Sequence, residues 1–367
     1  ENLLQMIDYS NSKLLVESDK LRSGTVTWKS PSNLAIVKYW GKHGIQLPRN
    51  PSISMTLNNA FTQTKVSYEA RENHDDLFDI TFRFHGESQP AFAKKISSYF
   101  EKLLPVYPFL KQLKWDIESE NSFPHSAGIA SSASSMSALA LCLCSIEDEL
   151  FGSLSDDLLF DRKASYLSRL GSGSAARSVF PHWSVWGKAD FVNGSDDEFA
   201  IPYGSEVHED FKSFHDDILI VSKDEKSVSS TAGHQLMENN AFASPRYDQA
   251  TRRLQDLLVA MRKGDIECFG KIAEDEALTL HALMMASNPS YLLMHPNSLE
   301  IINRVRAYRK ETNNPVYFSL DAGPNIHLLY PENIVHDIRP FIEEQLVDLC
   351  VDGFWIKDWC GEGPEQL

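Results

Sequence analysis

Alternating apolar and polar side chains mark three segments in the first half of the chain, at residues 61–69, 79–84 and 113–118. Because a period of two sends successive side chains to opposite faces, this pattern predicts half-buried antiparallel strands. Residues 33–39 form a mostly apolar run, which predicts a buried strand. The first half of the chain is therefore expected to contain a sheet.

Helical periodicity predicts five helices, at residues 129–146, 156–170, 247–263, 265–285 and 298–310. The first begins directly after Gly128, with small side chains followed by apolar ones. The third ends at Gly264, where a left-handed residue is favoured. Three more strands are predicted at residues 217–222, 315–320 and 326–330, the last two joined by the turn 321–325.

This mixture of strands and helices predicts an α+β fold of packed α/β layers. A chain of 367 residues suits two domains, because single cores stop growing near about 250–300 residues. We place the boundary in the Gly- and acid-rich stretch near residues 200–210, which gives domains of residues 1–208 and 209–367. The position of the tail after about residue 345 stays open.

Composition narrows the class of protein. The hydrophobic fraction of 42% and charged fraction of 23% are those of an ordinary globular protein. The formal net charge of −16 disfavours nucleic acid and anionic membranes as partners. The longest apolar run, residues 138–144, is far shorter than the ~18 residues of a membrane span. Five scattered cysteines and a polar N-terminus without signal-peptide features favour a cytoplasmic protein with reduced thiols.

A serine-rich turn precedes the first predicted helix, in the sequence NSFPHSAGIASSASSMSA at residues 121–138. Free amide groups at a helix N-terminus attract anions, Gly128 permits close approach of a phosphate, and the hydroxyls of Ser131, Ser132 and Ser134 add donors. The alternative is a capped helix whose small residues allow close packing. The Gly-Lys-Ser/Thr of a Walker loop is absent.

Basic residues gather where the first clear strand ends. Lys38 and Lys42 are four residues apart around Gly41, and Arg49 follows in a loop. Two such lysines can converge on one anion, although each could equally be solvated. The intervening aromatic Tyr39 favours the first interpretation, because large aromatics at a strand end usually line a site or a core.

A second group of polar residues, GSGSAARS at residues 171–178, fits the dinucleotide pattern G-x-G-x-x-A only formally, because a helix rather than a strand precedes it. Hydroxyls from Ser172 and Ser174 beside Arg177 instead suggest a carboxylate-binding loop. The alternative is a flexible loop that ends the helix. Asp321, at the end of a predicted strand, is either an ordinary turn residue or a general base.

Other catalytic signatures are missing. The sequence contains no G-x-S-x-G elbow, no H-E-x-x-H and no C-x-x-C pair, so serine-hydrolase and zinc-site interpretations lack support.

Taken together, these motifs resemble the diphosphomevalonate decarboxylases of the GHMP kinase superfamily. The resemblance rests on five segments that come in the family's order, namely SNLAIVKYWGK (32–42), NPSISMTL (50–57), SFPHSAGIASSASSMSALAL (122–141), GSGSAARS (171–178) and FSLDAGPN (318–325). It implies the GHMP kinase fold, with an N-terminal ribosomal protein S5 domain 2-like domain, a C-terminal ferredoxin-like domain and an active site in the cleft between them.

The resemblance also implies an activity. Members use ATP and Mg²⁺ to phosphorylate the 3-hydroxyl of 5-diphosphomevalonate, and loss of phosphate and carbon dioxide then gives isopentenyl diphosphate in the mevalonate pathway of isoprenoid biosynthesis. Members are commonly homodimers. Alternatives are a decarboxylase or 3-kinase acting on another mevalonate phosphate, or a catalytically silent nucleotide-binding protein of the same fold.

Residue roles follow from the same resemblance. Asp321, Arg177 and Lys38 match catalytic positions, and Arg177 is expected to hold the substrate carboxylate. Substrate-binding positions are matched by Tyr39, Lys42, Ser172, Ser174 and Arg177. ATP-binding positions are matched by Gly128, Ser131, Ser132 and Ser134, with Ser229, Ser230 and Thr231 as lesser candidates. Magnesium is expected to bind through the ATP phosphates, with Ser132 as a candidate ligand.

Three places depart from the family pattern. His43 and Gly44 replace a frequent Arg-Asp, Pro51 replaces a serine, and residues 181–182 replace a Gly-Gly. None removes a proposed catalytic group. The first two lie near the substrate-binding strand end, so they leave the phosphorylation state of the substrate open.

Overall fold

The computed structural model describes the chain except for residues 1–7, 73, 125–128, 130 and 225–226. Within the described residues, eight strands form a large mixed sheet, six of them in the order β14-β1-β4-β7-β5-β6, with β8 pairing with β4 and β9 pairing with β8. Their bounds are β1 (Gly24–Val37), β4 (Ser52–Ala70), β5 (Asp79–Phe84), β6 (Glu87–Ser88), β7 (Leu113–Asn121), β8 (Trp183–Trp186), β9 (Ala200–Pro202) and β14 (Glu365–Gln366).

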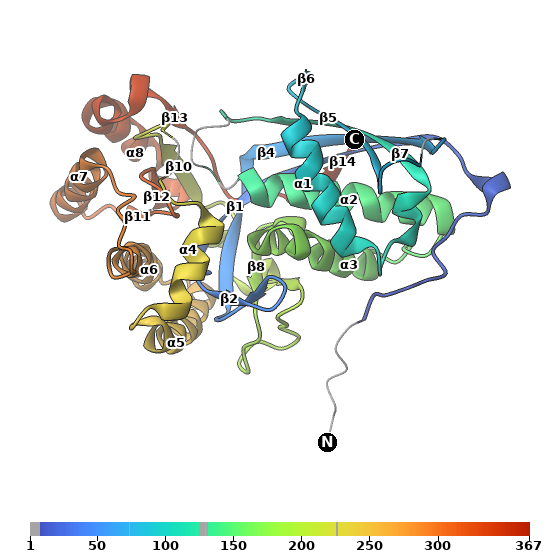
Figure 1. Cartoon of the computed structure of the whole chain (residues 1–367). Helices are drawn as coiled ribbons and strands as arrows, with labels where there is room; N and C mark the ends of the chain where they lie inside the picture. Colours follow the sequence, from blue (N-terminus) through green and yellow to red (C-terminus); the bar gives the residue numbers. More distant parts are fainter. Residues whose placement is uncertain (1–7, 73, 125–128, 130, 225–226) are drawn as a thin grey trace.

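Three helices, α1 (Pro90–Leu103), α2 (Ser131–Phe151) and α3 (Asp157–Gly171), lie together on one side of this sheet (Figure 1). Helix α2 is apolar almost all round, because it packs against the sheet on one side and against α3 on another. A short hairpin of β2 (Lys42–His43) and β3 (Leu47–Pro48) follows the end of β1.

A second sheet, in the described second half, has four strands in the order β11-β12-β10-β13. Its bounds are β10 (His215–Leu219), β11 (Tyr317–Ser319), β12 (Ile326–Tyr330) and β13 (Trp355–Ile356). The associated helices are α4 (Ser230–Leu236), α5 (Ala243–Lys263), α6 (Ile266–Met285), α7 (Pro296–Thr312) and α8 (Val335–Phe341). Helix α5 ends at Gly264 with a φ of 75°, as its sequence predicted.

The predicted strands and helices are all present, although β1 and β4 each begin nine residues before the predicted segments, and the predicted α+β class is confirmed. One pairing prediction is wrong. Strand β5 runs parallel to β7, whereas β4 and β7 are antiparallel as expected. The reason is α1, which connects β5 and β6 to β7 by a crossover, and a helical crossover joins parallel strands.

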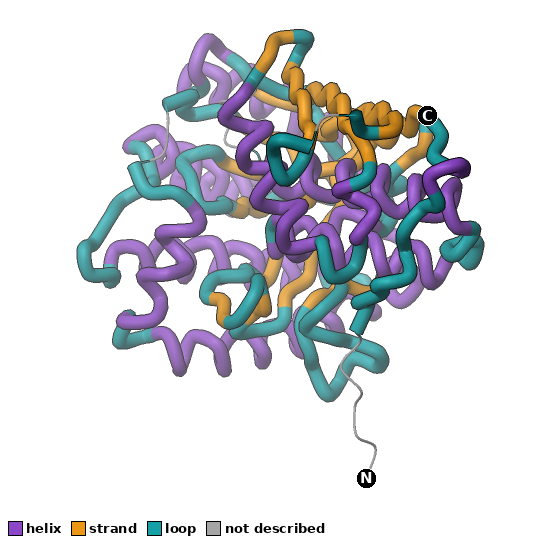
Figure 2. The backbone as a smooth tube through the Cα atoms, turned by 45° about the vertical axis from the view of Figure 1, so that its right-hand side comes forward, coloured by secondary structure: helices purple, strands orange, loops and turns teal. Residues whose placement is uncertain are grey.

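Side chains from the last part of β1 and the first part of β4 pack into the same hydrophobic core as side chains of the second half of the chain. Leu34, Ile36 and Met55 are fully buried in one cluster with Leu254 and Phe269 of helices α5 and α6. The C-terminus lies beside the strands of the first sheet (Figures 1 and 2), because β14 pairs with β1 in antiparallel register. None of the described helices combines the length and apolarity required to cross a membrane.

Candidate active site

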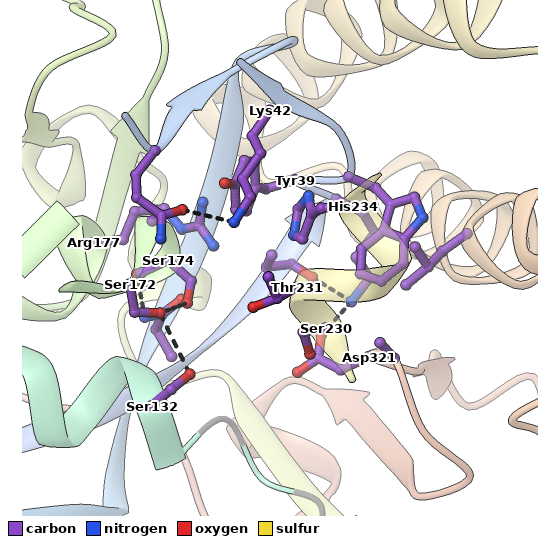
Figure 3. A pocket seen from close by; sticks show the side chains of 18 of the residues that line it. Tyr39, Lys42, Ser132, Ser172, Ser174, Arg177, Ser230, Thr231, His234 and Asp321 are labelled. Carbon is purple, nitrogen blue, oxygen red and sulfur yellow. Dashed lines mark hydrogen bonds and ion pairs between the residues drawn. The ribbon is translucent and has the colours of Figure 1, made fainter. Parts of the chain in front are cut away.

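A cavity of ≈ 380 Å³ opens where the two halves of the chain meet (Figure 3). Its walls come from the end of β1, the N-terminus of α2, the loop after α3, helix α4 and the turn between β11 and β12. Segments far apart in the sequence therefore contribute side chains to one space.

A buried lysine meets a carboxylate across the cavity. Lys38 follows the last residue of β1, and its Nζ donates to the carbonyl of Ala35 at 2.6 Å and to Oδ1 of Asp321 at 3.0 Å. The Lys38 side chain is 3% exposed and that of Asp321 27%. The Asp321 backbone carbonyl is 2.9 Å from Nε2 of His281 on α6, which fixes the turn that carries the carboxylate. Lys38 thus holds Oδ1 of Asp321, while the Asp321 side chain still lines the cavity.

Arg177 lies in the short helix η3 (Gly173–Val179), directly after α3. Its Nη1 donates to Oγ of Ser52 at 2.6 Å, and the guanidinium lies 5.6 Å from the ring centroid of Trp186. Burial lowers the pKa of Arg177 to about 10, opposed by the negative charge of Asp321, so the side chain remains protonated at neutral pH. Its Nε has no hydrogen-bond partner among the described residues. A buried cation with an unused donor at a cavity is suited to bind an anion.

Hydroxyl groups line the opposite wall. Ser172 Oγ is 3.4 Å from Oγ of Ser132 at the start of α2 and 3.4 Å from Oγ of Ser174 (Figure 3). Ser131 lines the same cavity. Ser134 does not, because its buried hydroxyl is 2.6 Å from that of Thr62 on β4. Gly128 lies outside the described residues.

Lys42 and Tyr39 line the cavity on the side nearest the β2–β3 hairpin. Lys42 Nζ donates to Oε1 of Gln46 at 3.1 Å, and partial burial lowers the pKa of Lys42. Burial raises the pKa of Tyr39 far above its usual value, so it is a neutral hydroxyl. That hydroxyl is buried without a hydrogen-bond partner in the described part of the chain. It is therefore a second polar group available to a bound molecule.

Helix α4 brings Ser230, Thr231 and His234 to the cavity. Ser229 caps this helix instead, since its Oγ accepts from the amide of Ala232 at 3.2 Å. His234 was not anticipated from the sequence. Its Nδ1 accepts from the amide of Gly41 at 2.9 Å, and burial, aided by Lys42, lowers its pKa to about 3.

His234 is therefore a neutral imidazole in this structure. Its ring packs against Tyr39 and Trp40, with centroid distances of 4.4 and 4.6 Å. Gly233 makes this possible, because a Cβ at that position would lie 2.5 Å from Cζ2 of Trp40. The only sequence signal was a Gly-His pair in an otherwise hydroxyl-rich segment.

The cations that were expected to converge do so in part. Lys38, Lys42 and Arg177 all line the cavity. Arg49 does not, and its Nη2 is instead 3.3 Å from Oε1 of Glu238 at the surface. No group of three or more His, Cys, Asp or Glu side chains within the described ranges is placed to bind a metal ion.

A second cavity of ≈ 510 Å³ adjoins the first at Ser131, Ser132 and Gly171. Its lining is largely apolar and aromatic, with lysines on α1, and includes Phe82, Phe84, Phe92, Lys95, Tyr99 and Lys102. Sequence patterns did not indicate it, because its side chains come from β5, β7, α1 and α2. The two cavities together offer an apolar space beside a polar, cationic one.

The chain is similar to known proteins along most of its length. A family model for the diphosphomevalonate decarboxylase-like N-terminal domain matches residues 30–198, and one for the mevalonate 5-diphosphate decarboxylase C-terminal domain matches residues 217–350. Diphosphomevalonate decarboxylase of Candida albicans is 30% identical over 321 residues, which cover 84% of each chain.

Solved structures give the same result. Mevalonate diphosphate decarboxylase from Staphylococcus aureus is 27% identical with a TM-score of 0.80, covering 94% of this chain and 98% of that one. A structure of MDDEF in complex with MVAPP, AMPPCP and magnesium is 26% identical with a TM-score of 0.79, covering 94% and 99%.

Proposed function

The chain belongs to the diphosphomevalonate decarboxylase family, and we propose that the cleft converts 5-diphosphomevalonate and ATP into isopentenyl diphosphate, ADP, phosphate and carbon dioxide. The observation that carries this proposal is the arrangement of one carboxylate, Asp321, against buried Lys38 with Arg177 in the same cavity. Such a site can accept a proton at one point and hold negative charge at others.

In the proposed arrangement, Asp321 faces the 3-hydroxyl of the substrate and accepts its proton as a phosphoryl group is transferred to that oxygen. Lys38, hydrogen-bonded to Asp321, keeps the carboxylate oriented. Arg177 binds the substrate carboxylate through its unused donor. Breaking the bond to that carboxylate supplies the electron pair of the new double bond, while phosphate leaves the 3-carbon.

The diphosphate of the substrate is assigned to Lys42, Tyr39, Ser172 and Ser174, which line one side of the cavity. Lys42 supplies a cation there, and the unpartnered Tyr39 hydroxyl supplies a donor. Fixing both ends of the substrate orients the reacting carbon and displaces water from the site. These roles agree with those implied by the sequence motifs.

ATP and Mg²⁺ fit the remaining groups. The ATP phosphates are assigned to Ser131, Ser132, Ser230 and Thr231, with Ser132 as the candidate Mg²⁺ ligand. A hydroxyl beside phosphates suits Mg²⁺, which takes few protein ligands and is held mainly by phosphate and water oxygens. When bound, Mg²⁺ neutralises phosphate charge during transfer. The adjoining aromatic cavity, which contains Phe84 and Tyr99, is assigned to the nucleobase.

The decisive experiment is product analysis with labelled 5-diphosphomevalonate and Mg²⁺-ATP. We expect labelled carbon dioxide and isopentenyl diphosphate in equal amounts with ADP. Parallel assays with mevalonate 5-phosphate and mevalonate test the substrate assignment, since the departures at residues 43, 44 and 51 lie near the diphosphate side. ATP turnover without carbon dioxide from any of the three substrates would contradict the decarboxylase proposal.

We further propose a cytoplasmic homodimer whose two domains meet near residue 208. All five cysteines are free, and four of them are buried, which supports a reducing compartment. The proposed boundary lies between strand β9 of the first sheet and β10 of the second. Light scattering on a size-exclusion column tests the dimer, which has twice the chain mass of 41.5 kDa.

A further inference from the structure

A buried ion pair lies directly behind Lys38. Glu276 on α6 accepts two hydrogen bonds from Arg246 on α5, both at 2.6 Å, and the two side chains are 0% and 2% exposed. Arg253 adds a third contact to Glu276 at 3.0 Å. Burial, the largest single influence, would raise the pKa of Glu276, but the hydrogen bonds and charge of Arg246, together with the Lys38 amide and Arg253, outweigh it. The pKa is therefore lowered and the pair is ionised.

This ion pair also binds the backbone of Lys38. Oε2 of Glu276 accepts from the Lys38 amide at 2.8 Å, and Nη2 of Arg246 donates to the Lys38 carbonyl at 3.3 Å. Asn50 donates to the same carbonyl at 3.1 Å. Both polar groups of the Lys38 main chain are therefore held by side chains rather than by a neighbouring strand, just after β1 ends at Val37.

We propose that Glu276 and Arg246 are positioning residues that set where Lys38 meets Asp321. The pair comes from helices of the second half, whereas Lys38 directly follows the first strand, so the contact fixes one half of the site relative to the other. A displacement of the Lys38 main chain carries its Nζ away from Asp321, and misplacement of about 1 Å can cost about a hundredfold in rate. The inference rests on the proposed roles of Lys38 and Asp321.

A purely structural role, joining α5 to α6, is the competing explanation. The chain offers a matched control for it. Glu274, also on α6, is 7% exposed and forms a comparable ion pair with Arg309 at 2.7 and 3.2 Å, but it does not contact Lys38 or line the cavity. Loss of either carboxylate disrupts a largely buried ion pair between α6 and a neighbouring helix. Only loss of Glu276 frees the Lys38 backbone.

The experiment compares Glu276→Gln with Glu274→Gln. A glutamine at 276 has one acceptor oxygen for donors on two sides, so either the Lys38 amide or the arginines lose their partner. We expect kcat for carbon dioxide release to fall about tenfold or more in Glu276→Gln, with the KM for ATP changed little. Glu274→Gln is expected to keep kcat within about twofold of wild type, although its melting temperature falls as well.

Hydrogen exchange at the Lys38 amide gives a readout independent of turnover. We expect faster exchange of this amide in Glu276→Gln and no change in Glu274→Gln. Equal kcat for the two variants, or unchanged protection of the Lys38 amide, would overturn the inference. Failure of wild-type protein to release carbon dioxide would instead refute the proposed function, while the exchange comparison would still test the positioning contact.

A second pair of variants, which conserve charge, tests the same inference if Glu276→Gln does not fold. Arg246→Lys removes the bidentate contact and the donor to the Lys38 carbonyl. Arg253→Lys alters flanking contacts to Glu276, Gln249 and Thr279, none of which involves Lys38. We expect kcat and Lys38 amide protection to fall in Arg246→Lys and to stay near wild type in Arg253→Lys. Equal behaviour of these two variants would also contradict the positioning role.

Discussion

Among the described residues, three cations face the cleft of a chain whose formal net charge is −16. The excess of acidic residues does not oppose an anionic substrate, because charges at the surface are screened over about 8 Å at physiological ionic strength. Inside the cleft, Lys38, Lys42 and Arg177 act at short range and with little water between them. The local charge of the site, rather than the net charge, decides which small molecule it binds.

Asp321 carries the sharpest prediction at this scale. Replacing it by Asn keeps the shape of the side chain but removes the negative charge that pairs with Lys38 and the capacity to accept a proton. We expect Asp321→Asn to lose about a thousandfold or more in kcat, as removal of a general base does. ATP binding, followed by calorimetry, should remain near wild type. Asp337→Asn on α8 is the control, and an Asp321→Asn variant with wild-type kcat would disprove the assignment.

Arg177 provides a pH test. Its pKa of about 10 keeps it charged from pH 6 to 9, so wild-type kcat/KM should show no loss from Arg177 in this range. In Arg177→Lys, the same burial lowers the pKa of an ammonium whose usual pKa is about 10.4. We therefore expect kcat/KM to be lower at all pH values and to decline further as pH rises towards 9. A flat profile for this variant would contradict the buried-cation interpretation.

The sequence motifs predicted most groups of the cavity but not their orientations. Ser132 lines the cavity, whereas Ser134 is turned towards β4, because two residues along a helix rotate the side chain by about 200°. Arg49 pairs at the surface because its loop leads away from the strand end. His234 could not be predicted, since its role depends on contact with Tyr39 and Gly41, nearly 200 residues earlier.

At the scale of elements, the hydrophobic periodicity predicted whether a segment is a strand or a helix better than it predicted how the strands pair. Strands β5 and β7 alternate in the same way whether they pair parallel or antiparallel, so the pattern could not distinguish the two. The connecting helix α1 decides it, and its apolar face was not recognised in the sequence. Helix α4, with only seven residues and many hydroxyls, likewise lacks the periodicity that marks α5 and α6.

Helix α4 should dock onto the cleft in a pH-dependent manner. Docked His234 has a pKa of about 3, whereas an undocked histidine has a pKa near 6.5. The undocked state therefore binds more protons between these values, and docking is strongest above pH 6.5 and weakens as pH falls through the window. We expect the amides of α4 to exchange faster at pH 5 than at pH 7, after correction for intrinsic rates.

The matched variant is His234→Gln, which retains an acceptor for the Gly41 amide but has no titrating group. Its α4 exchange should change much less between pH 7 and pH 5 than that of wild type. Equal pH sensitivity in both proteins would show that another group, such as Lys42 or a residue outside the helix, controls docking.

At the scale of the whole molecule, the C-terminal segment connects the two sheets. Its position was left open at the sequence level, since β13 and β14 are two residues each and carry no periodic pattern. The structure shows β13 pairing with β10 of the second sheet and β14 pairing with β1 of the first. Long-range pairing of such short strands depends on partners that only the folded core provides. The C-terminal segment therefore links the two sheets by pairing with a strand of each.

Within that segment, we expect Asp358 to contribute most to the contact between the two sheets. It is fully buried, and its carboxylate accepts from the amides of Asn58, Asn59 and Ala60 on β4, each at 2.8 Å. Its own carbonyl accepts from the amide of Asp216 on β10 at 3.0 Å. The Asp358 side chain is hydrogen-bonded to the first sheet and its main chain to the second, so this one residue contacts both sheets.

We predict that Asp358→Ala destabilises the protein by about 2 kcal/mol or more, because the amides of Asn59 and Ala60 lose their acceptor, at about 1–3 kcal/mol each, while that of Asn58 keeps the Trp359 carbonyl. Denaturant unfolding, followed by tryptophan fluorescence, measures this change. Glu362→Gln is the control, since the Glu362 side chain is 85% exposed and reaches only His182. A variant with an unchanged midpoint would mean that β4 keeps its amides satisfied without Asp358, and that the halves are held together by the shared core around Leu34 and Phe269 instead.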